Sequence, residues 1–164
     1  GFATYGPFEK LSIDRQRDEI NVNCIAPVEL THALLPGMLQ QGSGVIINVA
    51  STAAMQPDPY MAIYGATKAF VRQFSLNLRT DLKGTNIRVT NIEPGFAETE
   101  FSNVRFKGDN EKAAAVYKGT KALDKEDIAN TIFTLSQLPQ HVNVNTIEIM
   151  PTMQTCNGLF LERY

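Results

Sequence analysis

The sequence predicts an α/β domain built on a parallel sheet. Three short runs rich in β-branched residues each follow a stretch with apolar residues at helical spacing, and this alternation is typical of parallel strands joined by helices. The chain has 164 residues, which is enough to bury a substantial core and favours one domain.

The first half of the chain is predicted to form a helix, a strand and a second helix. Residues 14–40 form the first predicted helix, which ends at the glycine-containing segment 42–44. Residues 45–50 (VIINVA) are predicted to form a strand that is buried on both faces. Residues 61–82 form the second predicted helix. Its apolar stripe at four-residue spacing consists of Ala66, Phe70, Phe74, Leu78 and Leu82.

The second half is predicted to form a strand, an irregular segment, a helix and a last strand. Residues 86–93 are the first of these strands, and residues 98–120 are predicted to be short helices and loop. Residues 124–138 are predicted to be a helix, because the first of them is an aspartate suited to an N-cap and acidic residues follow in the first turn. Residues 143–150 form the last predicted strand.

Composition excludes several classes of partner. The net charge is -2 without a basic cluster, which argues against nucleic-acid binding. No apolar run approaches the roughly 18 residues of a membrane span, and no signal-peptide pattern is present, so no membrane partner is expected. The cysteines, Cys24 and Cys156, and the histidines, His32 and His141, are isolated and have no metal-ligand spacing. We therefore expect reduced thiols, no metal and a cytoplasmic location.

Tyr64 and Lys68 stand four residues apart in a predicted helix and therefore share one face. A free tyrosine has a pKa near 10, so it is a poor acid or base at neutral pH. An ammonium about 4 Å away, at an effective dielectric of about 20, favours the phenolate by roughly 4 kcal/mol, or about three pKa units. The pair therefore suits general acid–base chemistry, although most such pairs are solvated surface contacts.

Ser51 follows the predicted strand 45–50 and precedes Tyr64 by 13 residues. Ligands in parallel α/β sheets bind beyond the carboxyl ends of the strands, so the Ser51 hydroxyl can donate to a substrate oxygen there. The alternative is that Ser51 only starts a turn.

Asn23 is singled out by Pro27. Proline has no N–H, and its ring clashes with the carbonyl of the residue four positions earlier, which is Asn23. A buried carbonyl without a helical partner calls for water or a ligand. The alternative is a plain proline kink hydrated by bulk water.

These residues belong to segments that resemble the short-chain dehydrogenase/reductase family. NVAS ending at Ser51 and YGATK beginning at Tyr64 resemble the active-site signature of the family. Residues 20–23 are similar to the helix segment that carries the fourth catalytic residue, and residues 94–99 are similar to the PGxxxT segment that lines the nicotinamide pocket. Gly1 resembles the last residue of the NNAG motif, so the similarity spans essentially the whole chain.

The resemblance implies a fold and a domain assignment. Residues 1–164 would be the catalytic, C-terminal part of a Rossmann-type doubly wound parallel sheet with flanking helices. The N-terminal cofactor-binding strands, about 80 residues at roughly 30 residues per βαβ unit, would lie before Gly1. The 164 residues contain no GxGxxG phosphate loop.

The resemblance also implies roles for single residues. Tyr64 would be the general acid and base, and Lys68 would lower its pKa and hold the nicotinamide ribose. Ser51 would bind the substrate oxygen, and Asn23 would hold a water molecule that relays protons. The expected cofactor-binding residues, besides Tyr64 and Lys68, are Pro94, Gly95, Ala97 and Thr99, of which the last two anchor the carboxamide.

More narrowly, residues 64–80 and 100–108 resemble the bacterial NADP-dependent 3-hydroxy acid dehydrogenases, whereas residues 1–63 resemble a second branch of the family about as well. This implies an oxidoreductase that transfers a hydride between NADP and the hydroxyl-bearing carbon of a small 3-hydroxy acid or related alcohol. NAD stays open, because the discriminating residues would precede Gly1. Arg105 is expected to bind a substrate carboxylate with its planar fork, and the alternative is a solvated loop arginine.

Two other functions are weighed against this one. A non-catalytic fragment, or a half-Rossmann module without the phosphate site, is the main alternative, and the intact mass of the native protein decides between them. A serine hydrolase using Ser51 and His32 is disfavoured, because no GxSxG elbow surrounds the serine.

The two long helices predict self-association as a homodimer or homotetramer. They carry more apolar residues than one buried stripe requires. The extra residues include Ala33, Leu34, Phe70 and Phe74.

Overall fold

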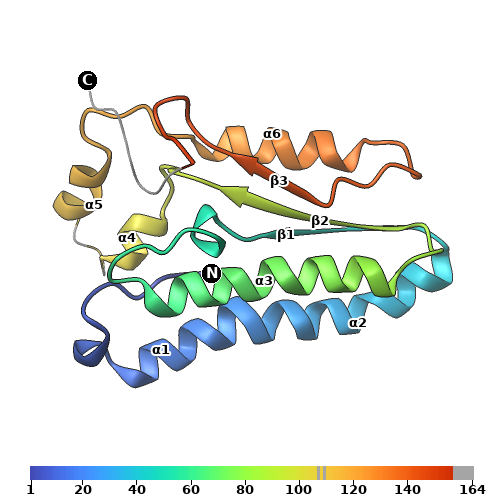
Figure 1. The fold of residues 1–164 in the computed structure, drawn as a ribbon, viewed down its shortest axis with the longest axis horizontal. Coiled ribbons are helices and arrows are strands. Elements are labelled where there is room, and N and C mark those ends of the chain that lie inside the picture. The colour runs from blue at the N-terminus through green and yellow to red at the C-terminus, as the bar shows by residue number, and fades with distance from the viewer. Residues whose placement is uncertain (107, 109, 157–164) are drawn as a thin grey trace.

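Three parallel strands form the sheet: β1 (Gly44–Val49), β2 (Ile87–Pro94) and β3 (Thr146–Ile149), in the order β1-β2-β3. They are seen in a computed structural model that describes residues 1–106, 108 and 110–156. Helices α1, α2 and α3 lie on one side of the sheet and α6 lies on the other (Figure 1). The predicted α/β class and parallel sheet are confirmed.

The central strand and the edge strand differ in burial. All residues of β2 except its last are buried, whereas β1 is half-buried and its last residue, Val49, is exposed. The expectation that residues 45–50 are buried on both faces is therefore wrong. Among the described residues β1 has a neighbouring strand on one side only, so its other edge is left uncovered.

The last strand begins three residues later than predicted. At Asn143 the side chain, instead of the backbone, forms the hydrogen bonds to β2. The Asn143 side chain accepts from the Val89 N–H at 2.8 Å and donates to the Val89 carbonyl at 3.0 Å. Regular pairing of β3 with β2 then starts at Thr146.

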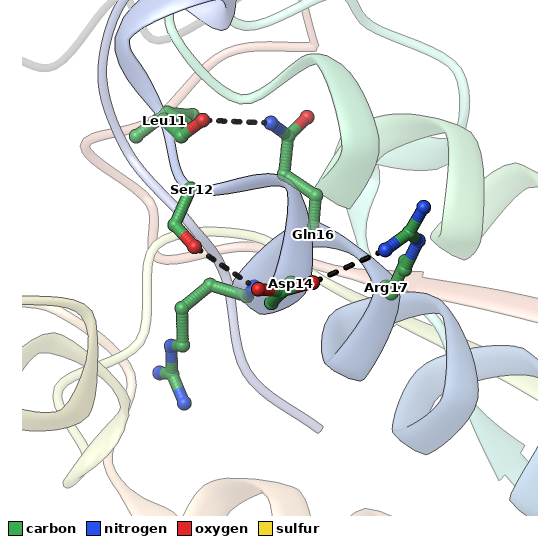
Figure 2. A network of polar contacts seen from close by, with 6 residues as sticks. Leu11, Ser12, Asp14, Gln16 and Arg17 are labelled. Carbon is green, nitrogen blue, oxygen red and sulfur yellow. Dashed lines mark hydrogen bonds and ion pairs between the residues drawn. The ribbon is translucent and has the colours of Figure 1, made fainter.

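The first helix, α1 (Ile13–Ile20), begins with polar contacts that replace missing helical hydrogen bonds (Figure 2). The Ser12 hydroxyl accepts from the backbone N–H of Arg15 at 3.4 Å, as an N-cap does. One turn further, the exposed side chains of Asp14 and Arg17 form an ion pair of 3.1 Å (Figure 2). Such an exposed pair contributes less than about 1 kcal/mol.

The predicted helix 14–40 is interrupted by a π-helical turn. After α1, residues Asn21–Ile25 form the wider turn, and α2 (Ala26–Gln41) continues the helix. The N–H of Ala26 donates to the carbonyl of Asn21, five residues earlier. The wide turn directly precedes Pro27, which has no N–H to continue the regular ladder. The proline thus coincides with a π turn rather than a simple kink.

Helix α3 (Ala62–Asp81) turns its polar and small residues toward the rest of the protein. Its buried residues are Tyr64, Thr67, Val71 and Ser75. Three residues of the predicted apolar stripe point outward: Ala66 and Phe70 are exposed and Phe74 is half-buried. The rings of Phe70 and Phe74 stack with centroids 6.0 Å apart.

The irregular segment and the last helix agree with the prediction. Helices α4 (Phe101–Arg105) and α5 (Asn110–Tyr117) are short, and α6 (Lys125–Ser136) begins with a reciprocal capping box between Asp124 and Asp127. Helix α6 ends two residues earlier than predicted. The buried Arg88 guanidinium of β2 binds the carbonyls of Leu135 and Ser136 at 2.8 and 2.7 Å, which satisfies the end of the helix.

The long helical segment Ile13–Gln41 presents an unpartnered apolar face. By length and composition alone it could cross a membrane: an 18-residue window within it has a mean hydropathy of 1.2, and 11% of that window is buried. The segment contains polar residues such as Glu29 and His32, so it is not the uninterrupted apolar run of about 18 residues that the sequence was found to lack. The exposed apolar residues are Ile20, Val22, Ile25, Leu30, Leu34 and Leu39.

Candidate active site

The predicted catalytic residues gather at the carboxyl ends of β1 and β2, the end of the sheet where α4 and α5 lie (Figure 1). Ser51 follows β1, and Tyr64 lies in the first turn of α3. The Ser51 hydroxyl accepts from the Ala53 N–H at 3.1 Å, which starts a short turn, and it is also the hydrogen-bond partner of the Tyr64 side chain. The interpretation of Ser51 as a turn former is confirmed, and its role toward a substrate oxygen stays a prediction.

Tyr64 is surrounded by apolar residues. Its exposed fraction is 9%, and it packs with Ala53 and Met61 in a small cluster to which Phe101 adds its ring, 5.3 Å from that of Tyr64. Burial raises the pKa of Tyr64 above its ordinary value, and the hydrogen bond from Ser51 opposes this shift. The phenol is therefore held protonated at neutral pH in this structure.

Lys68 lies between the end of β1 and the ring of Tyr64. Its ammonium donates to the Val49 carbonyl at 2.8 Å and lies 5.7 Å from the centre of the Tyr64 ring. Burial lowers the pKa of Lys68 to about 8, and Lys68 is not among the groups that shift the pKa of Tyr64. The ammonium is thus directed at the end of β1 in this structure, and its lowering of the tyrosine pKa stays a prediction.

Asn23 joins the start of the chain to α3. The π-helical turn places its side chain inside the protein, with 3% exposed. Its amide donates to the Phe2 carbonyl at 2.9 Å and to the Thr67 hydroxyl at 3.0 Å, and its oxygen accepts from the Phe2 N–H at 3.1 Å. Thr67 in turn donates to the Tyr64 carbonyl at 2.8 Å. Asn23 thus supports the helix turn of Tyr64, and its water-holding role stays a prediction.

Gly1 lies against this asparagine. A Cβ at Gly1 would collide with the Asn23 side-chain oxygen, so only glycine allows the contact.

The segment after β2 is held by the last part of the described chain. The Gly95 N–H donates to the Ile149 carbonyl at 2.8 Å, and the Phe96 N–H donates to the Gln154 side chain at 2.6 Å. A Cβ at Gly95 would collide with the same Gln154 oxygen, so this close approach requires glycine. These hydrogen bonds fix the position of the segment. A loop that lines a nicotinamide pocket, as this one is expected to do, has to be held in place in this way.

Ala97 and Thr99 lie in the same loop. Ala97 pairs with Leu123, and the exposed Thr99 hydroxyl accepts from the Phe101 N–H at 3.2 Å, which leaves its hydrogen free to donate. Their roles toward a carboxamide stay predictions.

Arg105 is not a solvated loop arginine. It ends α4, is half-buried, and its Nε is buried without a hydrogen-bond partner among the described residues. Its positive charge also acts on Tyr64, whose pKa it lowers against the larger effect of burial. The predicted substrate residue therefore lies near the predicted acid–base.

Several residues of this region are not evident from the sequence. Thr67 is indicated only by its position one turn after Tyr64 on the same face. Glu19 is fully buried and accepts from the backbone and hydroxyl of Thr4 at 2.8 and 2.6 Å. Asp58 and Gln154 have no local pattern that would reveal them. Burial raises the pKa of Asp58, whereas the Arg105 charge lowers it.

Comparison with protein families agrees with this arrangement. The short chain dehydrogenase profile matches residues 1–110, which is more than half of the chain. The chain belongs to the short-chain dehydrogenase family.

Known relatives extend over almost the whole chain. It is 52% identical, over 158 residues, to the NADP-dependent 3-hydroxy acid dehydrogenase YdfG of Escherichia coli K12. That alignment covers 96% of this chain and 64% of the relative. A sulfoacetaldehyde reductase of Chromohalobacter salexigens is 49% identical over 87% of this chain and 57% of its own length. The chain thus spans somewhat less than two thirds of the curated relatives that it matches.

Solved structures show the same fold. The closed form of a serine dehydrogenase complexed with NADP+ superposes with a TM-score of 0.93 at 51% identity, over 100% of this chain and 67% of that one. A serine dehydrogenase from Escherichia coli has a TM-score of 0.78 at 42% identity, over 94% of this chain and 62% of that one. These neighbours agree with the expected Rossmann-type architecture.

Proposed function

We propose that the whole protein is an NADP-dependent oxidoreductase that transfers a hydride between the nicotinamide and the hydroxyl-bearing carbon of a small 3-hydroxy acid or related alcohol. The observation that carries this proposal is the contact of Ser51 with the buried Tyr64 at the carboxyl ends of the strands, with Lys68 beside them. Relatives that are named as NADP-dependent 3-hydroxy acid dehydrogenases, and that are 51% and 52% identical to this chain over the 158 aligned residues, support it.

The donors at this site fit the nicotinamide half of the cofactor. The Lys68 ammonium has three donors, of which one is used for Val49, so two remain for ribose hydroxyls. The Thr99 hydroxyl and the backbone of residues 94–97 lie in the loop that would face the carboxamide. When bound, the nicotinamide supplies or accepts the hydride. NAD would meet the same groups, so the preference for NADP depends on the relatives.

Tyr64 would move the proton. During reduction of a carbonyl group, its protonated phenol donates to the developing alkoxide while Ser51 donates a hydrogen bond to the same oxygen. During oxidation of an alcohol, the deprotonated phenol accepts the hydroxyl proton as the carbon loses its hydride. Because burial raises the pKa of Tyr64, the protonated form prevails near neutral pH and reduction is favoured there.

The full-length protein with NADP tests this function. Tyr64→Phe should lower kcat by about 10²–10⁴-fold, the usual contribution of a positioned acid–base, while NADPH binding measured by fluorescence stays unchanged. Tyr60→Phe is a matched control, because Tyr60 is 55% exposed and should retain its turnover. Equal turnover of Tyr64→Phe and wild type would refute the assignment.

The proposed assembly and location follow from the same family. We propose a homodimer or homotetramer that covers the apolar outer faces of α2 and α3, a cytoplasmic location, and small molecules rather than nucleic acid or membrane as partners. The exposed side chains of Leu30, Leu34 and Phe70 support the association. Light scattering and cell fractionation test these proposals.

A further inference from the structure

The buried face of α1 and of the π-helical turn after it is polar. Gln16, Glu19 and Asn23 are all buried, Glu19 completely, and their spacing of three and four residues places them along one helix face. Burial of a polar group is costly unless the group finds hydrogen-bond partners. The Gln16 amide finds its partner in the segment before the helix, where it donates to the Leu11 carbonyl at 3.4 Å (Figure 2).

The other two side chains of this face hold the first residues of the chain. The Glu19 carboxyl accepts from the N–H of Thr4 at 2.8 Å and from its hydroxyl at 2.6 Å, both through Oε2. The Asn23 side chain accepts from the Phe2 N–H at 3.1 Å and donates to the Phe2 carbonyl at 2.9 Å. The residues on both sides of Ala3 are therefore anchored to one helix face.

Ala3 connects these anchors to the proposed acid–base. It is 2% exposed and belongs to the buried cluster that contains Met61 and Tyr64. Because Phe2 and Thr4 are each fixed by a side chain of the helix, Ala3 has little freedom to move away from this cluster. The two anchors thus determine the position of one part of the surface that packs around the Tyr64 ring.

Glu19 is the unusual member of this face, because it is an acid buried without a cation. Its Oε1 is buried and has no hydrogen-bond partner, and within the described residues no lysine or arginine forms an ion pair with it. The Arg15 guanidinium, one turn earlier, lies 4.4 Å from the centre of the Phe2 ring instead. Burial raises the pKa of Glu19, so its environment disfavours the charge. The carboxyl therefore contributes here through its hydrogen bonds to Thr4.

We propose that Glu19 is a positioning residue of this oxidoreductase: by holding Thr4 it keeps Ala3 against the Tyr64 ring and so fixes the phenol for proton transfer. The inference rests on the proposed function, in which Tyr64 moves the proton. Glu19 touches neither substrate nor cofactor in this role. A displacement of about 1 Å at a reacting group can lower a rate about a hundredfold, so a remote anchor of this kind affects catalysis.

Three substitutions in the full-length protein separate the hydrogen bonds of Glu19 from its charge. Glu19→Met removes both acceptors and the charge and keeps a side chain of similar length. Glu19→Gln removes the charge but keeps an oxygen that can accept from both donors of Thr4. Thr4→Val removes the hydroxyl from the other side of the contact and keeps the backbone N–H.

The measurement is the oxidation by NADP of L-serine or 3-hydroxypropionate, whichever the wild-type protein oxidises faster. kcat is expressed per NADPH-binding site titrated by fluorescence, so that a loss of folded protein does not count as a loss of catalysis. The solvent deuterium isotope effect on kcat and the melting temperature are recorded for each variant. A purely structural role would change the melting temperature or the number of titrated sites and leave the isotope effect unchanged.

Glu19→Met should lower kcat about ten- to a hundredfold and change KM by less than about threefold. Its solvent isotope effect should increase, because proton transfer at a displaced phenol becomes the slow step. Thr4→Val should show the same changes to a smaller extent, with kcat lower by about three- to tenfold. Glu19→Gln should stay within about threefold of wild type in kcat, because the contacts with Thr4 persist.

Matched controls come from α6, on the other side of the sheet (Figure 1). Glu126→Met and Thr134→Val make the same replacements at exposed positions and should leave kcat and the isotope effect unchanged. Equal losses in Glu19→Gln and Glu19→Met, or an unchanged kcat and isotope effect in Thr4→Val, would overturn the inference, and the latter result decides even if Glu19→Met does not fold. A wild-type protein that oxidises neither acid, nor a neutral alcohol such as 2-propanol, would instead refute the proposed function.

Discussion

The two faces of helix α3 differ in a way that reverses the usual amphipathic pattern. The inner face carries Tyr64, Thr67 and Ser75, whose polar groups are buried and hydrogen-bonded. The outer face carries the stacked rings of Phe70, which is exposed, and Phe74, which is half-buried. The contrast teaches that an apolar stripe on a helix indicates a face that is favourably buried. It does not show that the same chain buries that face.

Ser75 shows how the inner face tolerates polar groups. Its hydroxyl donates to the Val71 carbonyl at 2.8 Å and accepts from the Asn48 side chain at 2.9 Å. Burial of a hydroxyl that both donates and accepts a hydrogen bond costs little free energy, whereas burial of a hydroxyl without partners costs about 1–3 kcal/mol. The inner face can therefore be polar because the sheet and the neighbouring helices provide partners.

Among the substitutions that test this comparison, Lys68→Met is expected to have the largest effect on activity and stability. We expect kcat/KM to fall about a hundredfold or more, because the ammonium next to Tyr64 and the proposed ribose site is lost. Stability should rise, because the pKa of Lys68, lowered to about 8 by burial, means that the folded state disfavours its charge. This stabilisation should be greatest below pH 8 and fade as pH rises toward the unfolded-state pKa, about 10.4.

Thermal unfolding at several pH values and steady-state kinetics measure both effects. Lys83→Met is the control, because Lys83 is exposed just beyond the end of α3 and should alter neither quantity. A Lys68→Met protein with lower stability and full activity would contradict the prediction.

The pH dependence of the two reaction directions should differ. Because burial raises the pKa of Tyr64, oxidation by its deprotonated form should increase about tenfold per pH unit below that pKa, and reduction should stay level until the phenol loses its proton. Initial rates in both directions across pH, with saturating substrate, check this. An oxidation rate independent of pH between neutral and alkaline conditions would refute the role of burial.

Thr67→Val tests the polar inner face by a smaller change. The Asn23 amide would lose its partner on α3, so the free energy of unfolding should fall by about 1–3 kcal/mol. Thr67→Ser keeps the hydroxyl and is the control, with a smaller loss from the missing methyl group. Urea denaturation measures both, and equal stability of the valine and wild-type proteins would show that the contact contributes nothing.

The smallest effect on the folded monomer is expected on the outer face. Phe70→Gln should change its stability by no more than about 0.5 kcal/mol, because the ring is 43% exposed, but should weaken self-association. Light scattering over a range of concentrations measures association, and Glu126→Gln, a change at an exposed residue of α6 on the other side of the sheet, is the control that should leave association unchanged. An unchanged molar mass in Phe70→Gln would argue against an interface at this face.

Local patterns predicted most of the fold. The strand positions, the capping of α6 and the shared face of Tyr64 and Lys68 follow from periodicity and from residue types that act over four residues or fewer. The predicted bounds of helices and strands were less accurate where a residue far away in the sequence forms hydrogen bonds at the end of the element. Asn143 delays β3 by bonding β2 with its side chain, and Arg88 satisfies the end of α6.

The sequence by itself determined the order of helices and strands, the family, and the place of Ser51 and Tyr64 at the ends of β1 and α3. Helical and strand periods are properties of neighbouring residues, so a pattern of residue types is sufficient to reveal them. Only the tertiary structure decided which face of α3 is buried, that the Lys68 charge is directed at Val49, and that Arg105 lies against the Phe101 ring, which contacts Tyr64. Electrostatic environment depends on groups far apart in the chain, and packing alone brings them together.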